Sequence, residues 1–115
     1  MKEIINEYIE AKRKYDETCE KQKRMAEPYH KLMDEGKISE DEWIEKLEKV
    51  DDEVGLDEAM MQCIDAEKKL IKRGIEEFKK MARDEKEKEM FNEIEEGIYL
   101  PSVREKVIDL IIKFL

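Results

Sequence analysis

The 115-residue sequence has few of the residues that interrupt helices or form ligand-binding loops, with four glycines, two prolines, two serines and one threonine. Its longest apolar stretch, at 107–115, is far shorter than the ~20 residues that a helix needs to cross a bilayer. Glycine-rich phosphate loops, Cys-x-x-Cys pairs and Ser-His-Asp arrangements are also absent. These absences exclude a membrane-spanning helix and the enzyme classes that depend on those motifs, and we expect no membrane partner.

Cysteine is also scarce. Cys19 and Cys63 are too few to hold together a disulfide scaffold of this length. The first residues, MKEIINEYIEAKRK, have charges where a secretory signal has an apolar run. We therefore expect free thiols and a cytoplasmic location.

Positive charge is in deficit, because 32 Asp and Glu stand against 23 Lys and Arg and give a net charge of −9. Proteins that bind nucleic acid along its phosphate backbone need a surplus of Lys and Arg. The basic clusters at 12–14, 21–24, 68–69, 72–73 and 79–80 are interleaved with Glu, as on a solvated ion-pair face. The composition therefore disfavours a nucleic-acid partner, and a nucleic-acid-associated regulator is the second alternative function.

Strong helix formers dominate what is present, and they predict an all-α protein. Abundant Glu and Lys with few Asn and Gln is a composition typical of thermophiles. Apolar residues that recur every three or four positions predict a single domain over 1–115, a bundle of four to five helices with two long antiparallel helices. The predicted helices span 2–34, kinked near 28, then 39–54, 57–96 and 101–115.

The clearest local signals lie between the first two predicted helices. Gly36 suits the left-handed residue that ends a helix, and Ser39 with Glu42 forms a capping box. The pattern from Leu32 to Leu47 resembles the short C-terminal domain, a helical hairpin found at the ends of many bacterial proteins. The cap signals themselves predict a helical corner at 34–40, and nothing is carried over from the resemblance.

Three further features of the helices depend on weaker signals. Residues 83–89 contain no apolar side chain, but all are fair to good helix formers, so we predict continuous helix through them. Pro28 lacks the amide hydrogen that would bond to the carbonyl of Arg24, so we expect a kink or break there. Ser102 and Glu105 predict a second capping box at the start of the last helix.

The last predicted helix is apolar around most of its circumference. Leaving one of its faces in water would forfeit several kcal/mol, which is comparable with the stability of a small domain. We therefore predict a homodimer with these helices at its centre, and the alternative is a monomeric bundle whose core is built around this helix. The predicted interface residues are Val107, Ile108, Ile111, Ile112, Phe114 and Leu115.

One set of side chains suggests a metal site. Glu27 and His30 have the Glu-x-x-His spacing of ferritin-like di-iron bundles. If the two long helices ran antiparallel with Met33 near Met60, Cys63 and Glu67 would lie at the same level. The alternative function is therefore a metal-binding bundle of di-iron type that holds iron or another transition metal. Otherwise we expect no cofactor.

No motif points to a catalytic residue. The sequence predicts a structural or protein-interaction module that is not an enzyme and that acts through a homodimeric helical surface. A partner would be bound by apolar stripe residues and selected by the charged rim around them. The identity of this protein partner does not follow from the sequence.

Overall fold

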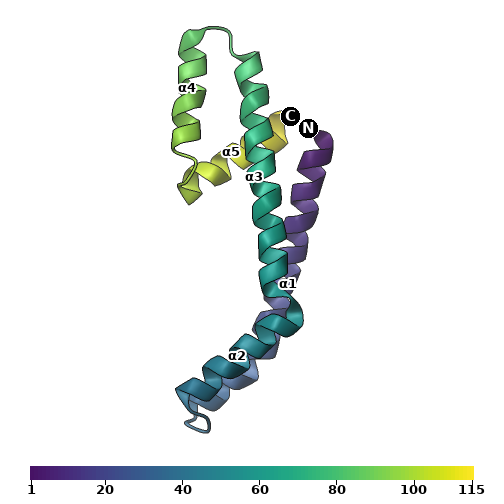
Figure 1. The fold of residues 1–115 in the computed structure, drawn as a ribbon, viewed down its shortest axis with the longest axis vertical. Coiled ribbons are helices and arrows are strands. Elements are labelled where there is room, and N and C mark those ends of the chain that lie inside the picture. Colours follow the sequence, from purple (N-terminus) through teal and green to yellow (C-terminus); the bar gives the residue numbers. More distant parts are fainter. The chain divides into compact units, whose positions relative to one another are not determined.

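A computed structural model describes all 115 residues and contains five helices and no strand (Figure 1). This confirms the predicted all-α class and the count of four to five helices. Helices α1 and α3 are the two long ones. The helices are α1 (Lys2–Asp34), α2 (Glu40–Val54), α3 (Leu56–Met81), α4 (Glu85–Glu96) and α5 (Pro101–Phe114).

The chain forms two compact units, whereas one domain was predicted. We call Met1–Tyr8 with Asp65–Leu115 the terminal unit and Ile9–Ile64 the central unit. The boundary between them falls inside α1 and α3, each of which is a continuous helix there. No linker therefore separates the units, and the one-domain organisation stays a prediction.

The terminal unit is built around a single apolar core to which α1, α3 and α5 contribute. Leu70 and Ile111 are fully buried at its centre. Several side chains, among them Ile4, Phe78 and Ile94, pack against this core while remaining partly exposed. The buried core residues are Ile5, Tyr8, Leu70, Ile71, Ile75, Val107, Ile108 and Ile111.

The central unit contains the helical corner that the sequence predicts. Gly36 has φ of +72°, and the side chain of Ser39 accepts a hydrogen bond of 3.2 Å from the backbone amide of Glu42. Gly55 ends α2 with φ of +70°. A side chain at either glycine would be strained, because positive φ is unfavourable for residues with a Cβ atom.

Helix α1 does not break at Pro28. On one side of the proline, the Gln22 amide donates to the carboxylate of Asp51 over 3.0 Å. On the other side, the Trp43 indole donates to Nδ1 of His30 over 2.9 Å. Contacts with α2 thus hold both sides of the proline and compensate for the hydrogen bond that it removes. The predicted break is wrong, and the bend at this position stays a prediction.

The predicted continuous helix over 57–96 is also wrong, because α3 ends at Met81 and α4 begins at Glu85. Asp84 is the N-cap of α4, and its carboxylate accepts a bond of 2.9 Å from the amide of Glu87. The side chain of Glu87 in turn accepts one of 2.8 Å from the amide of Arg83. These local bonds satisfy the first amides of a new helix, so the chain reverses where propensity alone favours continuation.

The start of α5 differs from the second predicted capping box. Leu100 is the N-cap without a side-chain hydrogen bond, and Pro101 occupies the first turn. Ser102 therefore lies inside the helix. Proline suits this position because its fixed φ matches the helix and the missing amide hydrogen would have no helical partner.

Candidate interaction groove

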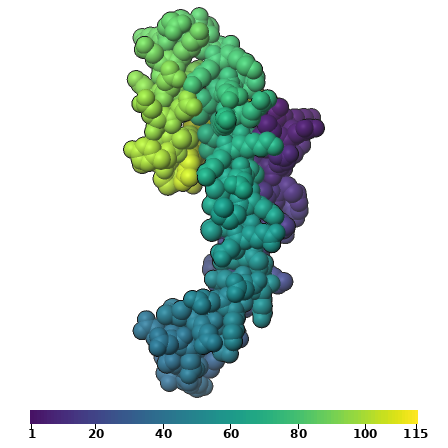
Figure 2. Space-filling view, viewed as in Figure 1, coloured from purple at the N-terminus to yellow at the C-terminus, as the bar shows by residue number.

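An apolar groove opens between α3, α4 and α5 in the terminal unit, with a cavity volume of about 240 Å³. The space-filling view shows the atoms of α4 and α5, in green to yellow, lying against those of α3 (Figure 2). No titratable or polar side chain lines the groove, so its chemistry supports the binding of apolar groups and offers no acid, base or nucleophile. Its lining residues are Ile75, Phe78, Phe91, Ile94, Val107, Leu110 and Phe114.

The reversal of the chain before α4 creates one wall of this groove. Phe78 of α3 and Phe91 of α4 stack with ring centroids 5.8 Å apart and planes inclined by 8°. In a continuous helix, thirteen residues would separate these rings by about 20 Å along the axis. The ammonium group of Lys79 also lies 2.6 Å from the carboxylate of Glu95. Helix α4 has no buried residue, and these two contacts together with the packing of Ile94 against the core hold it beside α3.

The floor of the groove depends on a close approach of α5 to α3. Gly74 is a buried glycine on α3, and a Cβ atom there would overlap the side chain of Ile111. The absence of a side chain at Gly74 therefore lets Ile111 reach full burial. The sequence signal was an isolated glycine within a helical pattern, which marks close backbone packing.

The rim of the groove exposes large apolar side chains. Leu110 is 46% exposed and Phe114 is 61% exposed. The ammonium group of Lys113 lies 5.3 Å from the centroid of the Phe114 ring, within the range of a cation–π contact. The rim therefore combines apolar area that is still open to water with a positive charge beside it.

The residues predicted as an interface have different environments. Val107, Ile108 and Ile111 are buried in the core of the terminal unit, and Leu115 packs against that core. Ile112 is 40% exposed and Phe114 is 61% exposed. The buried face of α5 is thus covered within the chain, and Ile112 and Phe114 remain available for a contact between chains.

The three candidate metal ligands are held by different neighbours. His30 of the central unit contacts Trp43, with ring centroids 5.6 Å apart. Glu67 of the terminal unit lies 3.8 Å from Nε of Arg104, a nitrogen that is buried without a hydrogen bond. Glu27 is exposed, and no group of three or more His, Cys, Asp or Glu side chains could hold a metal ion. The structure does not bring the predicted ligands together.

The predicted metal site assumed a helix register that the contacts of α1 do not show. Near Cys63 on α3, the neighbouring residue of α1 is Tyr15, and near Trp43 on α2 it is His30. The second half of α1 therefore faces α2, whereas the predicted site required Met33 to lie near Met60 of α3. Amphipathic stripes show which face of a helix is buried, but they do not specify which residues lie opposite each other.

The cysteines form a small polar cluster in the central unit. A hydrogen bond to Cys19 raises the pKa of the Tyr15 hydroxyl above its usual value. Negative charge on Cys19 raises it as well, followed by burial and by charge on Cys63 and Asp16. Neither cysteine forms a disulfide; Cys63 is buried and Cys19 is partly exposed.

Comparison with protein-family models finds no model that matches the chain, and comparison with curated proteins and with solved structures finds no significant match. No helix has the length and apolar character required to cross a membrane. The functional interpretation therefore depends on the groove and on the charged surfaces of this chain.

Proposed function

We propose that the protein is a structural, non-enzymatic interaction module that forms a homodimer through the groove and the adjacent rim of α5. The observation that supports this proposal is the wholly apolar lining of the groove beside two large apolar side chains that remain exposed, Leu110 and Phe114. Helical interaction surfaces commonly bind the apolar face of another helix in such a groove.

A two-fold arrangement fits these features, because the groove and the exposed rim lie next to each other on one chain. A two-fold axis would place the Leu110 and Phe114 pair of each copy against the groove of the other. Burial of each pair member would contribute about 1–2 kcal/mol. Since association itself costs at least about 4 kcal/mol, the groove lining must share in the contact. The charges around it would then exclude partners whose charges do not match.

Sedimentation velocity tests the proposal on the full chain. At high salt, we expect the wild-type chain to be a dimer and the Phe114→Glu chain to be a monomer, because a carboxylate in the apolar contact would lose much of its hydration. Tyr99→Glu is the matched control, since Tyr99 is 74% exposed and does not line the groove. Circular dichroism should show the same helix content in all three chains.

A wild-type chain that stays monomeric as its concentration is raised would refute the homodimer. Equal dissociation of the Tyr99→Glu chain would show that added negative charge, and not the groove, controls association.

A further inference from the structure

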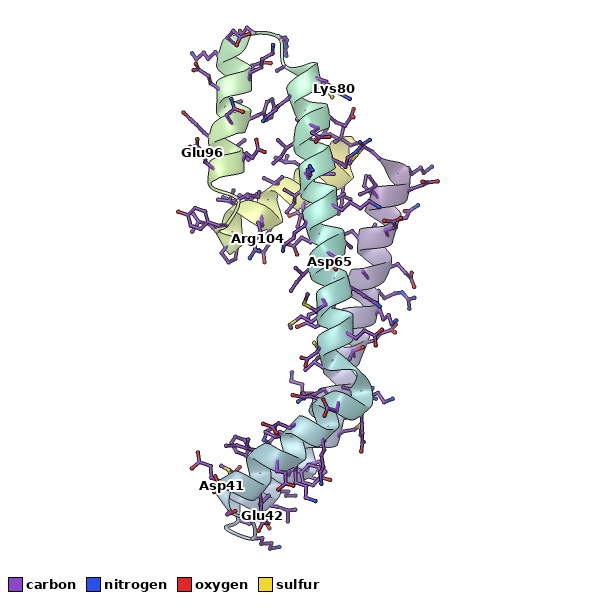
Figure 3. The ribbon with its side chains drawn as sticks, in the orientation of Figure 1. Asp41, Glu42, Asp65, Lys80, Glu96 and Arg104 are labelled. Carbon is purple, nitrogen blue, oxygen red and sulfur yellow. The ribbon has the colours of Figure 1, made fainter.

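Nearly all of the uncompensated charge of this protein lies in one segment. Residues 34–58 contain twelve Asp and Glu against three Lys and Arg, a net charge of −9, while the other 90 residues contain twenty of each. Within this acidic segment, only Glu35 and Glu45 form ion pairs, with Lys37 and Lys49. The segment comprises the turn after α1, all of α2 and the first turn of α3. Figure 3 labels Asp41 and Glu42 at the start of α2.

The charge at the end of α2 also opposes the helix dipole. The last turn of α2 has no basic residue, and its carboxylates are Asp51, Asp52 and Glu53. A negative charge beside the carbonyl end of a helix is unfavourable by about 0.3–1 kcal/mol. Asp51 accepts a hydrogen bond from Gln22, whereas Asp52 and Glu53 are exposed and form no ion pair. A cation supplied from outside this segment would remove the penalty.

The terminal unit carries a basic surface whose charge is opposite to that of the acidic segment. Residues 68–83 contain seven Lys and Arg against two Glu, a net charge of +5. A hollow with a cavity volume of about 480 Å³ lies on this stretch of α3, and we call it the basic hollow. Its lining residues are Ile4, Lys69, Lys72, Arg73 and Glu76.

Two of the cations in the basic hollow are available for a partner. Lys69 is paired with Glu7 of α1 over 3.2 Å. Lys72 and Arg73 are exposed and form no ion pair with any carboxylate of the chain. The guanidinium of Arg73 has the planar geometry that binds a carboxylate through two parallel hydrogen bonds.

We propose that the basic hollow docks the acidic segment of a second copy of this chain, so that Lys72 and Arg73 meet carboxylates near the end of α2, such as Asp52 and Glu53. Charge complementarity supports this occupant, since the same chain contains residues 34–58 with a net charge of −9 and residues 68–83 with a net charge of +5. At physiological salt the Debye length is about 8 Å, so repulsion between the net charges of two copies is screened while charges in contact still attract. This contact joins two different surfaces and does not depend on the apolar groove.

The experiment uses the Phe114→Glu chain, in which the groove contact is removed, and measures self-association by sedimentation velocity at low and high salt. We expect association at low salt that disappears at high salt, because ion pairs at a rim are screened. Adding Lys72→Glu and Arg73→Glu should weaken the low-salt association by at least about tenfold. The matched control is Lys86→Glu with Lys106→Glu, which changes the net charge equally at two exposed positions outside the hollow.

A charge-swap mixture identifies the occupant. The chain with Asp52→Lys and Glu53→Lys should associate with the Lys72→Glu, Arg73→Glu chain although neither self-associates, because in the mixture the unchanged pair of surfaces and the reversed pair both carry opposite charges. Three results would overturn the proposal: equal weakening by the control pair, no rescue in the mixture, or preferential binding of a DNA fragment by the wild-type hollow. The homodimer at the groove is judged separately, from the wild-type chain at high salt, so each proposal can fail without the other.

Discussion

The two units of this protein are stabilised in different ways. The terminal unit has a continuous core of eight buried residues, most of them Ile, Leu or Val. In the central unit the buried residues are Ala26, Val50, Ala59 and Cys63, and none of them is larger than valine. Large apolar side chains such as Ile44 and Met61 remain substantially exposed there. The central unit therefore depends more on helix caps and polar contacts.

Helix α5 distinguishes the terminal unit from the central unit, although the other helices of both units are similarly amphipathic. Each earlier helix presents an apolar stripe, but only the terminal unit contains α5, whose side chains reach α1 and α3 in one core. Burial of large side chains contributes more free energy than helix caps do. We therefore expect the central unit to open more readily than the terminal unit, because fewer apolar contacts oppose its opening.

Removing core volume from each unit tests this difference and should have the largest effect. Ile111→Ala should lower the free energy of unfolding by about 2–5 kcal/mol, because it opens a cavity at a fully buried position. Val50→Ala should lower it by about 1–2 kcal/mol, since less volume is lost. Urea denaturation followed by circular dichroism measures both values.

Fluorescence of Trp43, which is the only tryptophan, reports the central unit in the same samples. Ile111→Val controls for the size of the cavity and should cost only about 0.5–1.5 kcal/mol. Equal losses for Ile111→Ala and Val50→Ala would contradict the stated difference between the units.

A substitution at Gly74 tests how closely α5 packs in the terminal unit, with an intermediate effect. Alanine usually stabilises the middle of a helix, but here its Cβ atom would overlap Ile111. We expect Gly74→Ala to lower the free energy of unfolding by about 1–2 kcal/mol, since overpacking outweighs the gain in helix propensity. Gly97→Ala is the control, because its Cβ atom would meet nothing closer than 3.6 Å. Stabilisation by Gly74→Ala would show that the two helices are farther apart.

The smallest expected effect concerns the polar cluster of the central unit. Cys19→Ala should lower the pKa of Tyr15, because it removes both the hydrogen bond and the charge that raise this pKa. A raised pKa means that the Tyr15 hydroxyl keeps its proton to a higher pH in the folded state than in the unfolded state. The resulting stabilisation is complete below the usual tyrosine pKa of about 10 and is lost as the pH rises above it.

Titration of the tyrosinate absorbance measures this change directly. Cys19→Ser should give an intermediate pKa, since a hydroxyl keeps a hydrogen-bonding partner without the thiolate charge. Identical titration curves for the wild-type and Cys19→Ala chains would show that the cysteine does not act on Tyr15.

Local signals predicted the helices well where caps lie within a few residues of each other. Ser39 and Glu42, and the left-handed Gly36 and Gly55, mark the ends of α1 and α2 as their residue types suggest. The same logic could have located the break before α4, because Asp84 stands three residues before Glu87. Helix propensity over 83–89 favours continuation, but the Asp84 cap starts a new helix, so the predicted continuous helix is wrong.

The all-helical class and most of the helix ends follow from the amino-acid sequence alone, because hydrogen bonding and capping involve residues close together in the chain. The sequence also shows that the last helix has more apolar surface than one stripe can cover. Three features become visible only in the folded chain: Ile111 packs against Gly74, Phe91 folds back onto Phe78, and His30 and Glu67 have different neighbours. These outcomes depend on which residues of separate helices lie opposite each other, and that register follows from side-chain packing between distant parts of the chain.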